Sequence, residues 1–186
     1  MRDIPVFDWI IKVYGGINTV RDRIFTQKIG RFLQGAQTAS LEKRKMFVEM
    51  MRSHPAYQQK VGESLFLLID RHETLEKSKL LGKVFAAWIE GEITYEEYER
   101  YAFIIDRLFI HNLINLKKYY GKIEEFEASR EKGEQESQKR FLDEIILQAL
   151  FGDGLLDSTG YTETTYLRNT LGEKLIRLIG PEESGQ

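Results

Sequence analysis

The longest helical pattern in the sequence runs from Thr94 to about Tyr119. Its apolar residues recur at the three- and four-residue spacing that places side chains on one face of an α-helix. These residues are Tyr98, Tyr101, Ala102, Ile105, Leu108, Phe109, Leu113 and Leu116. A second apolar patch, Phe103, Ile110 and Ile114, lies away from that face. A helix that is apolar on two sides usually lies inside a bundle, so the pattern predicts a central helix roughly 36 Å long.

Five shorter helical patterns precede this central helix, over residues 4–14, 18–34, 41–52, 56–71 and about 75–90. In the last four, one apolar face is expected to point into the bundle. The residues on these inward faces are Phe25, Ile29, Phe32, Leu33, Leu41, Phe47, Val48, Met51, Tyr57, Val61, Leu65, Leu68, Ile69, Leu81, Val84, Phe85 and Trp88. Phe66 and Leu67 widen the apolar surface of their helix, which predicts that it is deeply buried.

Local signals mark several of the helix ends. Ser40 is a suitable N-cap for the helix that follows it, because its hydroxyl can accept a hydrogen bond from a free backbone N–H. Gly91 is suited to the left-handed conformation that ends a helix. Thr94 and Glu97 have the spacing of a capping box at the start of the central helix.

The composition changes after the central helix. Glutamates dominate residues 121–138, which predicts a fraying helix end and then a charged linker. A helix is expected over about 139–151, followed by a short hairpin and a last helix over about 170–179.

The sequence therefore predicts a mainly α protein with a small C-terminal helix–β-hairpin–helix module. A bundle of about six helices is expected over residues 1–125, beginning with the apolar helix 4–14. A linker over 126–138 leads to the module at 139–180, and residues 181–186 are expected to form a disordered tail.

Composition limits the class of protein. Apolar content of 42% and charged content of 30% are ordinary for a soluble globular chain of 186 residues. The absence of cysteine excludes disulfides, thiol nucleophiles and Cys-ligated zinc, and it suits a cytoplasmic location. Residues 1–60 carry 11 Lys/Arg against 5 Asp/Glu, a net charge of +6, whereas the rest of the chain carries −8. A basic first third can bind an anionic partner, and the alternative is that the two parts neutralise each other or are solvated.

The C-terminal segment carries a family resemblance. Gly154-Leu155-Leu156, a candidate hairpin, and Tyr166 to Ile176 with its turn Asn169-Thr170-Leu171-Gly172 resemble the wing and following helix of a winged-helix domain. The resemblance covers about 40 residues and implies a nucleic-acid-binding regulator. The chain as a whole also resembles small helical bacterial proteins of uncharacterised function.

Three patterns were considered for chemistry. Two Ile-Asp-Arg triplets, at 69–71 and 105–107, could supply paired carboxylates or cross-helix ion pairs, and the second interpretation is favoured. Arg107 and His111 resemble, with a short separation, the Arg and His of HEPN ribonucleases, which makes ribonuclease activity a second alternative function. Glu90 to Glu97 resembles half of an EF-hand loop, but Ala86 and Trp88 at ligand positions exclude calcium binding. No catalytic residue, metal or cofactor is therefore expected.

The apolar segment 4–14 is the best candidate for a contact surface. It contains eight large apolar residues and is too short to cross a bilayer, so it docks in its own bundle, on a protein partner or second copy, or at a membrane surface. Basic residues follow it at once. The candidate surface is Phe7, Trp9, Ile10, Arg21, Arg23, Lys28 and Arg31. The expected function is that of a non-enzymatic interaction or adaptor protein, with nucleic-acid binding through the C-terminal module as the first alternative.

Overall fold

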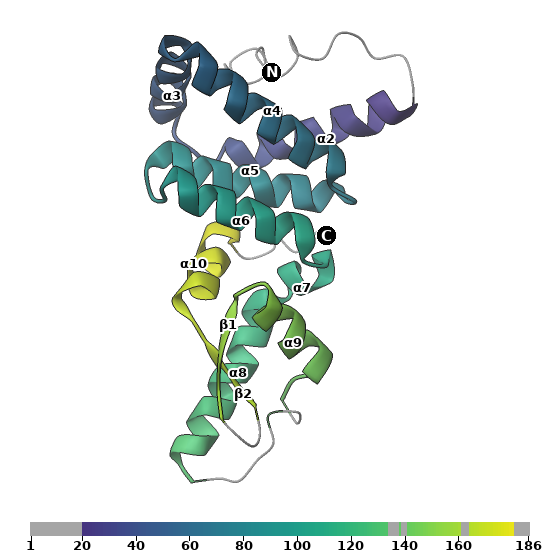
Figure 1. Ribbon diagram of the computed structural model, residues 1–186, viewed down its shortest axis with the longest axis vertical. Helices are drawn as coiled ribbons and strands as arrows, with labels where there is room; N and C mark the ends of the chain where they lie inside the picture. Colours follow the sequence, from purple (N-terminus) through teal and green to yellow (C-terminus); the bar gives the residue numbers. More distant parts are fainter. Residues whose placement is uncertain (1–19, 134–137, 139–140, 161–163, 181–186) are drawn as a thin grey trace. The chain divides into compact units, whose positions relative to one another are not determined.

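A computed structural model describes residues 20–133, 138, 141–160 and 164–180 (Figure 1). Within these residues it contains nine α-helices and one two-stranded antiparallel sheet. The chain forms two compact units, Met1–Asp106 and Arg107–Gln186, called unit 1 and unit 2 below. The predicted mainly α fold with a helix–hairpin–helix module near its C-terminus is confirmed.

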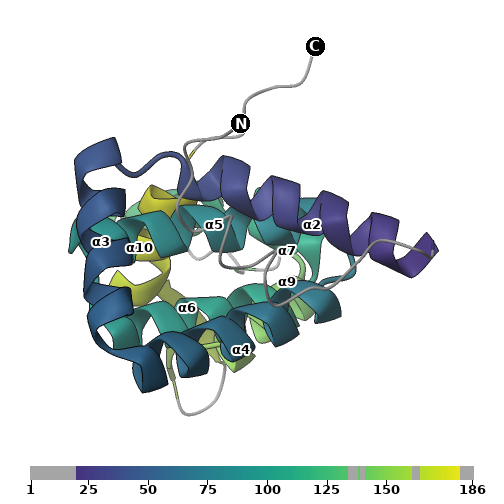
Figure 2. The same ribbon diagram turned by 90° about the horizontal axis from the view of Figure 1, so that it is seen from above.

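Unit 1 is an all-helical bundle in the part that the structure describes. Its helices are α2 (Val20–Ala36), α3 (Leu41–Ser53), α4 (Pro55–Arg71), α5 (Leu75–Glu90) and α6, which begins at Tyr95 and ends at Arg107. Figure 2 shows α3 closing one end of the bundle, between the end of α2 and the start of α4. These bounds agree with the predicted helices to within a few residues as far as Glu90.

The predicted helix ends of unit 1 are confirmed. The Ser40 hydroxyl accepts a hydrogen bond from the backbone N–H of Lys43. Gly91 follows α5 with a φ of 81°, a left-handed conformation that favours glycine. Thr94 and Glu97 cap α6 reciprocally, since the Thr94 N–H donates to the Glu97 carboxylate at 2.9 Å and the Glu97 N–H donates to the Thr94 hydroxyl at 3.1 Å.

Two glycines allow α2 and α5 to pack closely. A Cβ atom placed on Gly82 of α5 would overlap the carbonyl of Phe32 in α2, and one placed on Gly35 of α2 would overlap the carbonyl of Lys79 in α5. Only a residue without a side chain fits at either position. The rings of Phe32 and Phe85 lie 5.3 Å apart, so this close approach places the two helices on a shared aromatic core.

Aromatic side chains join α3, α5 and α6 in that core. Phe47, Phe85 and Trp88 make edge-to-face contacts, and Trp88 stacks on Tyr98 with ring centroids 5.2 Å apart. The inward faces predicted for α2 and α5 are confirmed in this core. Two predicted positions are wrong: Leu41 is exposed in the first turn of α3, and Leu67 is exposed because Val61, Leu65 and Ile69 form the buried face of α4.

The predicted central helix is wrong, because three helices occupy its place. After α6 ends at Arg107, α7 covers Ile110–Ile114 and α8 covers Leu116–Glu131. Between α6 and α7, Phe109 adopts an extended ψ of 132°. Its side chain is 64% exposed, although the pattern had placed it in the core. Neither glycine nor proline marks this break, so the sequence gives no local signal for it.

Unit 2 packs α8 against a hairpin and two short helices. They are α9 (Glu144–Gly152), β1 (Leu156–Thr159), β2 (Thr165–Arg168) and α10 (Thr170–Ile179). The strands are antiparallel, with Leu156 opposite Arg168 and Thr159 opposite Thr165. The boundary between the units precedes α7, and α8 extends to Glu131, so residues 126–131 of the predicted linker are helical.

Polar side chains fix the hairpin and α10 in unit 2. The Gln138 side chain donates to the Tyr166 carbonyl at 2.6 Å and accepts from the Tyr166 N–H at 2.9 Å, which satisfies both backbone groups of a buried strand residue. The Tyr120 hydroxyl donates to the carbonyl of Leu155. The Asn169 side chain accepts from the Gly172 N–H at 3.0 Å and so caps α10.

Candidate functional site

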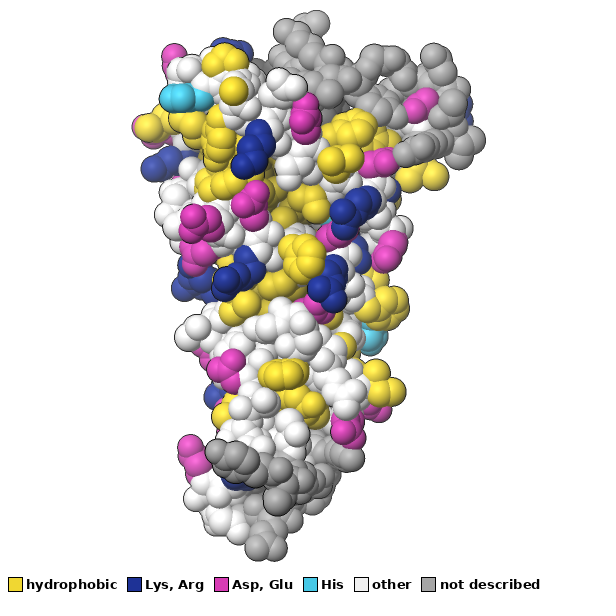
Figure 3. Space-filling view, in the orientation of Figure 1, with side chains coloured by type: hydrophobic (Ala, Val, Ile, Leu, Met, Phe, Trp, Pro, Cys, Tyr) yellow, Lys and Arg dark blue, Asp and Glu magenta, His cyan; other side chains and the backbone are white. Residues whose placement is uncertain are grey.

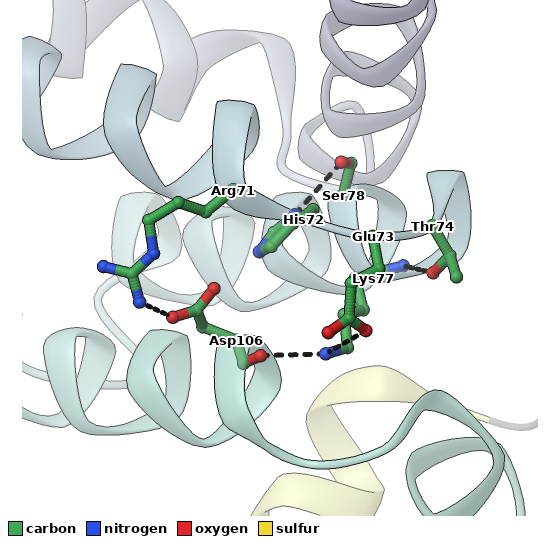
Figure 4. A network of polar contacts seen from close by, with 7 residues as sticks. All are labelled: Arg71, His72, Glu73, Thr74, Lys77, Ser78 and Asp106. Atoms are coloured by element: carbon green, nitrogen blue, oxygen red, sulfur yellow. Dashed lines mark hydrogen bonds and ion pairs between the residues drawn. The ribbon is translucent and has the colours of Figure 1, made fainter.

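The densest polar network in unit 1 surrounds Asp106 (Figure 4). Lys77, at the start of α5, is buried, and its Nζ donates to the backbone carbonyl of Asp106 at 2.8 Å and to the Glu73 carboxylate at 3.2 Å. Arg71, at the end of α4, forms an ion pair with the Asp106 carboxylate. Arg71 belongs to the first Ile-Asp-Arg triplet and Asp106 to the second, so the predicted cross-helix ion pair between them is confirmed.

Lys77 explains why the central helix breaks. In a continuous helix the Asp106 carbonyl would accept the N–H of Ile110, four residues later. Here the carbonyl accepts from the ammonium group of Lys77 instead, and Ile110 becomes the first residue of α7. The buried cation therefore satisfies the helix end that the missing backbone hydrogen bond leaves free.

His72 lies beside this network and is fully buried at the end of α4. Its Nδ1 is 3.1 Å from the Ser78 hydroxyl, and its Nε2 has no hydrogen-bond partner within the described part of the chain. Burial is the main cause that lowers the pKa of His72 to about 4, and the positive charges of Lys77, Lys28 and Arg71 lower it further. The imidazole is therefore neutral near pH 7 and places no charge at the end of α4.

The chemistry of this network is structural. Lys77 and His72 are enclosed by the bundle, which leaves neither side chain accessible to a substrate. Lys77 pairs with the Glu73 carboxylate and Arg71 with the Asp106 carboxylate, so the charges are matched inside unit 1. The network holds the ends of α4 and α6 to the start of α5 and offers no free nucleophile.

The candidate ribonuclease pair is split by the helix break. Arg107 ends α6 and lies 3.9 Å from the Asp153 carboxylate, whereas His111 is exposed in α7. The centroids of the His111 and Phe109 rings lie 6.4 Å apart, and the Asn115 side chain donates to the His111 backbone carbonyl at 2.9 Å. The two residues thus do not share one helix, which removes the arrangement that suggested a catalytic pair.

The described residues contain no group of three or more His, Asp or Glu side chains placed to hold a metal ion. Among their helices, none combines the length and apolar character needed to cross a bilayer.

The predicted contact surface is only partly described. Phe7, Trp9, Ile10 and the whole segment 4–14 lie outside the described residues, as does the side chain of Arg21. Arg23 and Arg31 are exposed on α2, and Arg31 donates to the Gln34 side chain at 3.1 Å. Lys28 is half-buried and donates to the Asp70 carbonyl at 2.7 Å, so it stabilises the contact between α2 and the end of α4.

The structure shows an apolar surface on unit 2 that sequence reasoning missed. In α9, Leu147 and Leu150 are buried, whereas Ile145 is 77% exposed and Phe151 is 44% exposed. The sequence does not reveal that Ile145 is exposed, because a nine-residue helix with apolar residues on both sides does not show which side is covered. Figure 3 shows hydrophobic side chains next to acidic ones over α9. Residues 141–167 contain five Asp/Glu and no Lys/Arg, a signal that the sequence does carry.

Comparison with protein-family models, with curated proteins and with solved structures finds no match for this chain. Its function is therefore argued from its own residues and geometry. The winged-helix resemblance of residues 139–180 stays a prediction.

Proposed function

We propose that this chain is a non-enzymatic interaction or adaptor protein, which self-associates or docks on a protein partner. Its contact element is the apolar segment 4–14 together with the basic outer face of α2. The observation that supports the proposal is the orientation of α2. Its apolar face is packed inside unit 1, and Arg23 and Arg31 are exposed on the other side of the helix.

The packing of α2 also bears on the role of the preceding segment. Phe25 contacts Phe66 of α4 with ring centroids 4.8 Å apart, and Phe32 contacts Phe85 of α5 at 5.3 Å. Helices α4 and α5 thus provide the partner surface that the apolar face of α2 needs. The large apolar residues of segment 4–14 are not required for that purpose, which favours their use in contact with another molecule.

The alternative of a nucleic-acid-binding regulator has less support. In the winged-helix resemblance, the helix before the hairpin is α9, and this helix has no Lys or Arg. Phosphate contacts by Lys and Arg dominate the affinity for nucleic acids. A cytoplasmic location is part of the proposal, and contact with an anionic membrane through Arg23 and Arg31 is the remaining alternative, at about 1 kcal/mol per charge.

Deleting residues 1–14 tests the proposal. Sedimentation velocity over about 1–100 µM should show association of the intact chain and a monomer after deletion, with a thermal midpoint equal to that of the intact chain at concentrations where it is monomeric. The substitution Trp9→Asp should reproduce this loss, and Leu67→Asp, at an exposed apolar residue of α4, is the matched control that should not.

Other outcomes would contradict parts of the proposal. If the deletion lowers the thermal midpoint by several degrees, segment 4–14 docks in its own bundle. If the intact chain is monomeric and co-sediments with anionic vesicles in a salt-sensitive manner, the membrane alternative replaces the protein partner. Salt-sensitive binding to duplex DNA that the deletion leaves unchanged would restore the nucleic-acid alternative.

A further inference from the structure

The exposed side of α9 has the properties of a docking surface. We call α9 face the exposed side of α9, which carries Ile145, Ala149 and Phe151, has Gln148 between Ile145 and Phe151, and has the carboxylates of Asp143 and Glu144 at its N-terminal end. Ile145 is the most exposed large apolar residue among those described, and Ala149 is half-buried beside it on the helix. Phe151 is held in place by an edge-on contact with Tyr166, with ring centroids 5.6 Å apart. Single exposed apolar residues are ordinary on protein surfaces, so the case for a docking surface rests on Ile145 and Phe151 together with the charge beside them.

The charge around the α9 face restricts the occupant. Asp143 caps the helix with its side chain, which accepts from the Ile145 N–H at 2.7 Å, and Glu144 follows in the first turn. Both residues are exposed. Residues 141–167 hold five acidic and no basic residues, and Asp153 pairs with Arg107, so the acidic edge of the α9 face is that of Asp143 and Glu144, which attracts cations and repels anions. A complementary ligand is therefore a peptide segment with large apolar residues and positive charges.

The chain itself contains such a segment. Residues 4–23 carry large apolar side chains and three basic residues, Lys12, Arg21 and Arg23, against Asp8 and Asp22, which gives the segment a net charge of +1. Resting on the proposed function, we infer that the α9 face of one copy binds residues 4–23 of a second copy. Apolar side chains of the segment would cover Ile145 and Phe151, and its arginines would lie near Asp143 and Glu144.

The size of the α9 face favours a reciprocal exchange between two copies. A helix of nine residues is about 14 Å long and about 10 Å across, so one contact is far smaller than the roughly 1,200 Å² of a stable interface. When each copy gives its segment to the other, the contact occurs twice and the assembly closes as a two-fold dimer. The second contact then forms within the complex, where the effective concentration is high.

The substitution Ile145→Lys in the full chain tests the receptor surface. It removes the central apolar group and adds a charge that repels the segment. Because Ile145 is exposed, circular dichroism should not change, nor should the thermal midpoint at concentrations where the wild type is monomeric. The dimer dissociation constant from sedimentation equilibrium should rise at least about tenfold, and added salt should weaken the wild-type dimer. The matched control Leu67→Lys, at an exposed apolar residue of unit 1, should leave the constant unchanged.

A mixing experiment tests whether the contact joins segment and receptor of different copies. Trp9→Asp impairs the segment and Ile145→Lys impairs the receptor, so each variant alone should be monomeric. Their mixture retains one intact segment and one intact receptor, and native mass spectrometry should show a heterodimer of the two labelled variants. Its affinity should lie below that of the wild type, because one of the two contacts is lost.

Several results would overturn the inference. If Trp9→Asp abolishes the dimer but Ile145→Lys does not, the segment binds elsewhere, and the proposed function stands while this inference fails. The same conclusion follows if both variants are monomeric and their mixture forms no heterodimer even well above the wild-type dissociation constant, where a single weak contact is populated. A monomeric wild-type chain at about 100 µM would exclude exchange between copies, and only docking on a different protein would remain of the proposed function.

Discussion

Lowering the pH should destabilise unit 1 through His72, before its carboxylates are protonated. In the unfolded chain a histidine has a pKa of about 6.5. In the folded protein, burial and the charges of Lys77, Lys28 and Arg71 hold the pKa of His72 at about 4. Between these two values the unfolded chain binds a proton that the folded protein does not. Stability is therefore fully present above the unfolded pKa and falls as the pH decreases towards the folded value.

The size of this effect follows from the two pKa values. Linkage gives a loss of about 2 kcal/mol at about pH 5 relative to pH 7, and about 3 kcal/mol near pH 4. Other groups with shifted pKa values affect stability in a different pH range or in the opposite direction. Hydrogen bonds from Ser40 lower the pKa of the Glu90 carboxyl, and the stability that this contributes is lost only below the ordinary carboxyl pKa. Burial raises the pKa of Asp153, which has the opposite effect on stability.

The assay is urea unfolding at pH 7, 6 and 5 and constant ionic strength, for the wild type and for His72→Asn. The asparagine amide can approach the Ser78 hydroxyl as Nδ1 does, but it does not titrate. The wild type should lose about 2 kcal/mol more than His72→Asn between pH 7 and 5. The matched control His54→Asn, at an exposed histidine, should behave like the wild type. Parallel pH profiles for the wild type and His72→Asn would refute the assignment of a depressed pKa to His72.

Two further predictions concern packing and are measured by urea unfolding at pH 7. Gly82→Ala should destabilise the protein by about 1–3 kcal/mol, because the added methyl group overlaps the Phe32 carbonyl, whereas Gly30→Ala, where space is open, should stabilise by about 0.5–1 kcal/mol. A neutral Gly82→Ala would show that α2 and α5 are farther apart than described. Phe109→Ala should cost no more than about 0.5 kcal/mol, because the ring is exposed, whereas Ile105→Ala should cost about 2–5 kcal/mol. Equal losses of stability for Phe109→Ala and Ile105→Ala would show that Phe109 is buried, as a continuous central helix predicts.

Helix ends were predictable because their signals are local. Ser40, Gly91 and the Thr94–Glu97 pair act on backbone groups within four residues of themselves, so the sequence contains both halves of each interaction. The inward faces of α2 and α5 were also predictable, because the helices are long enough for one face to be clearly apolar.

The break after α6 was not predictable, because its cause lies 29 residues earlier in the chain. Lys77 looks like an ordinary surface lysine in the sequence, and only the fold places its Nζ on the Asp106 carbonyl. The apolar pattern continues through Phe109 without interruption and therefore predicted one helix. The charge state of His72 was not predictable for the same reason. Its charge state depends on burial and on Lys28 and Lys77, whose positions no local pattern contains.

The α9 face could not be predicted in full from the sequence for a similar reason, although the sequence contains one signal that points to it. In α9, Ile145 and Leu147 are equally apolar, and only the packing of the hairpin and α8 decides that Leu147 is the buried one. The run of residues 141–167 without a single Lys or Arg is visible in the sequence, however, and it opposes the basic residues 1–60 in sign. Charge segregated in this way along a chain of near-neutral net charge favours association between unlike parts, and it makes that association sensitive to salt. An assembly held by the α9 face should therefore dissociate with added salt, whereas one held by apolar contacts alone should not.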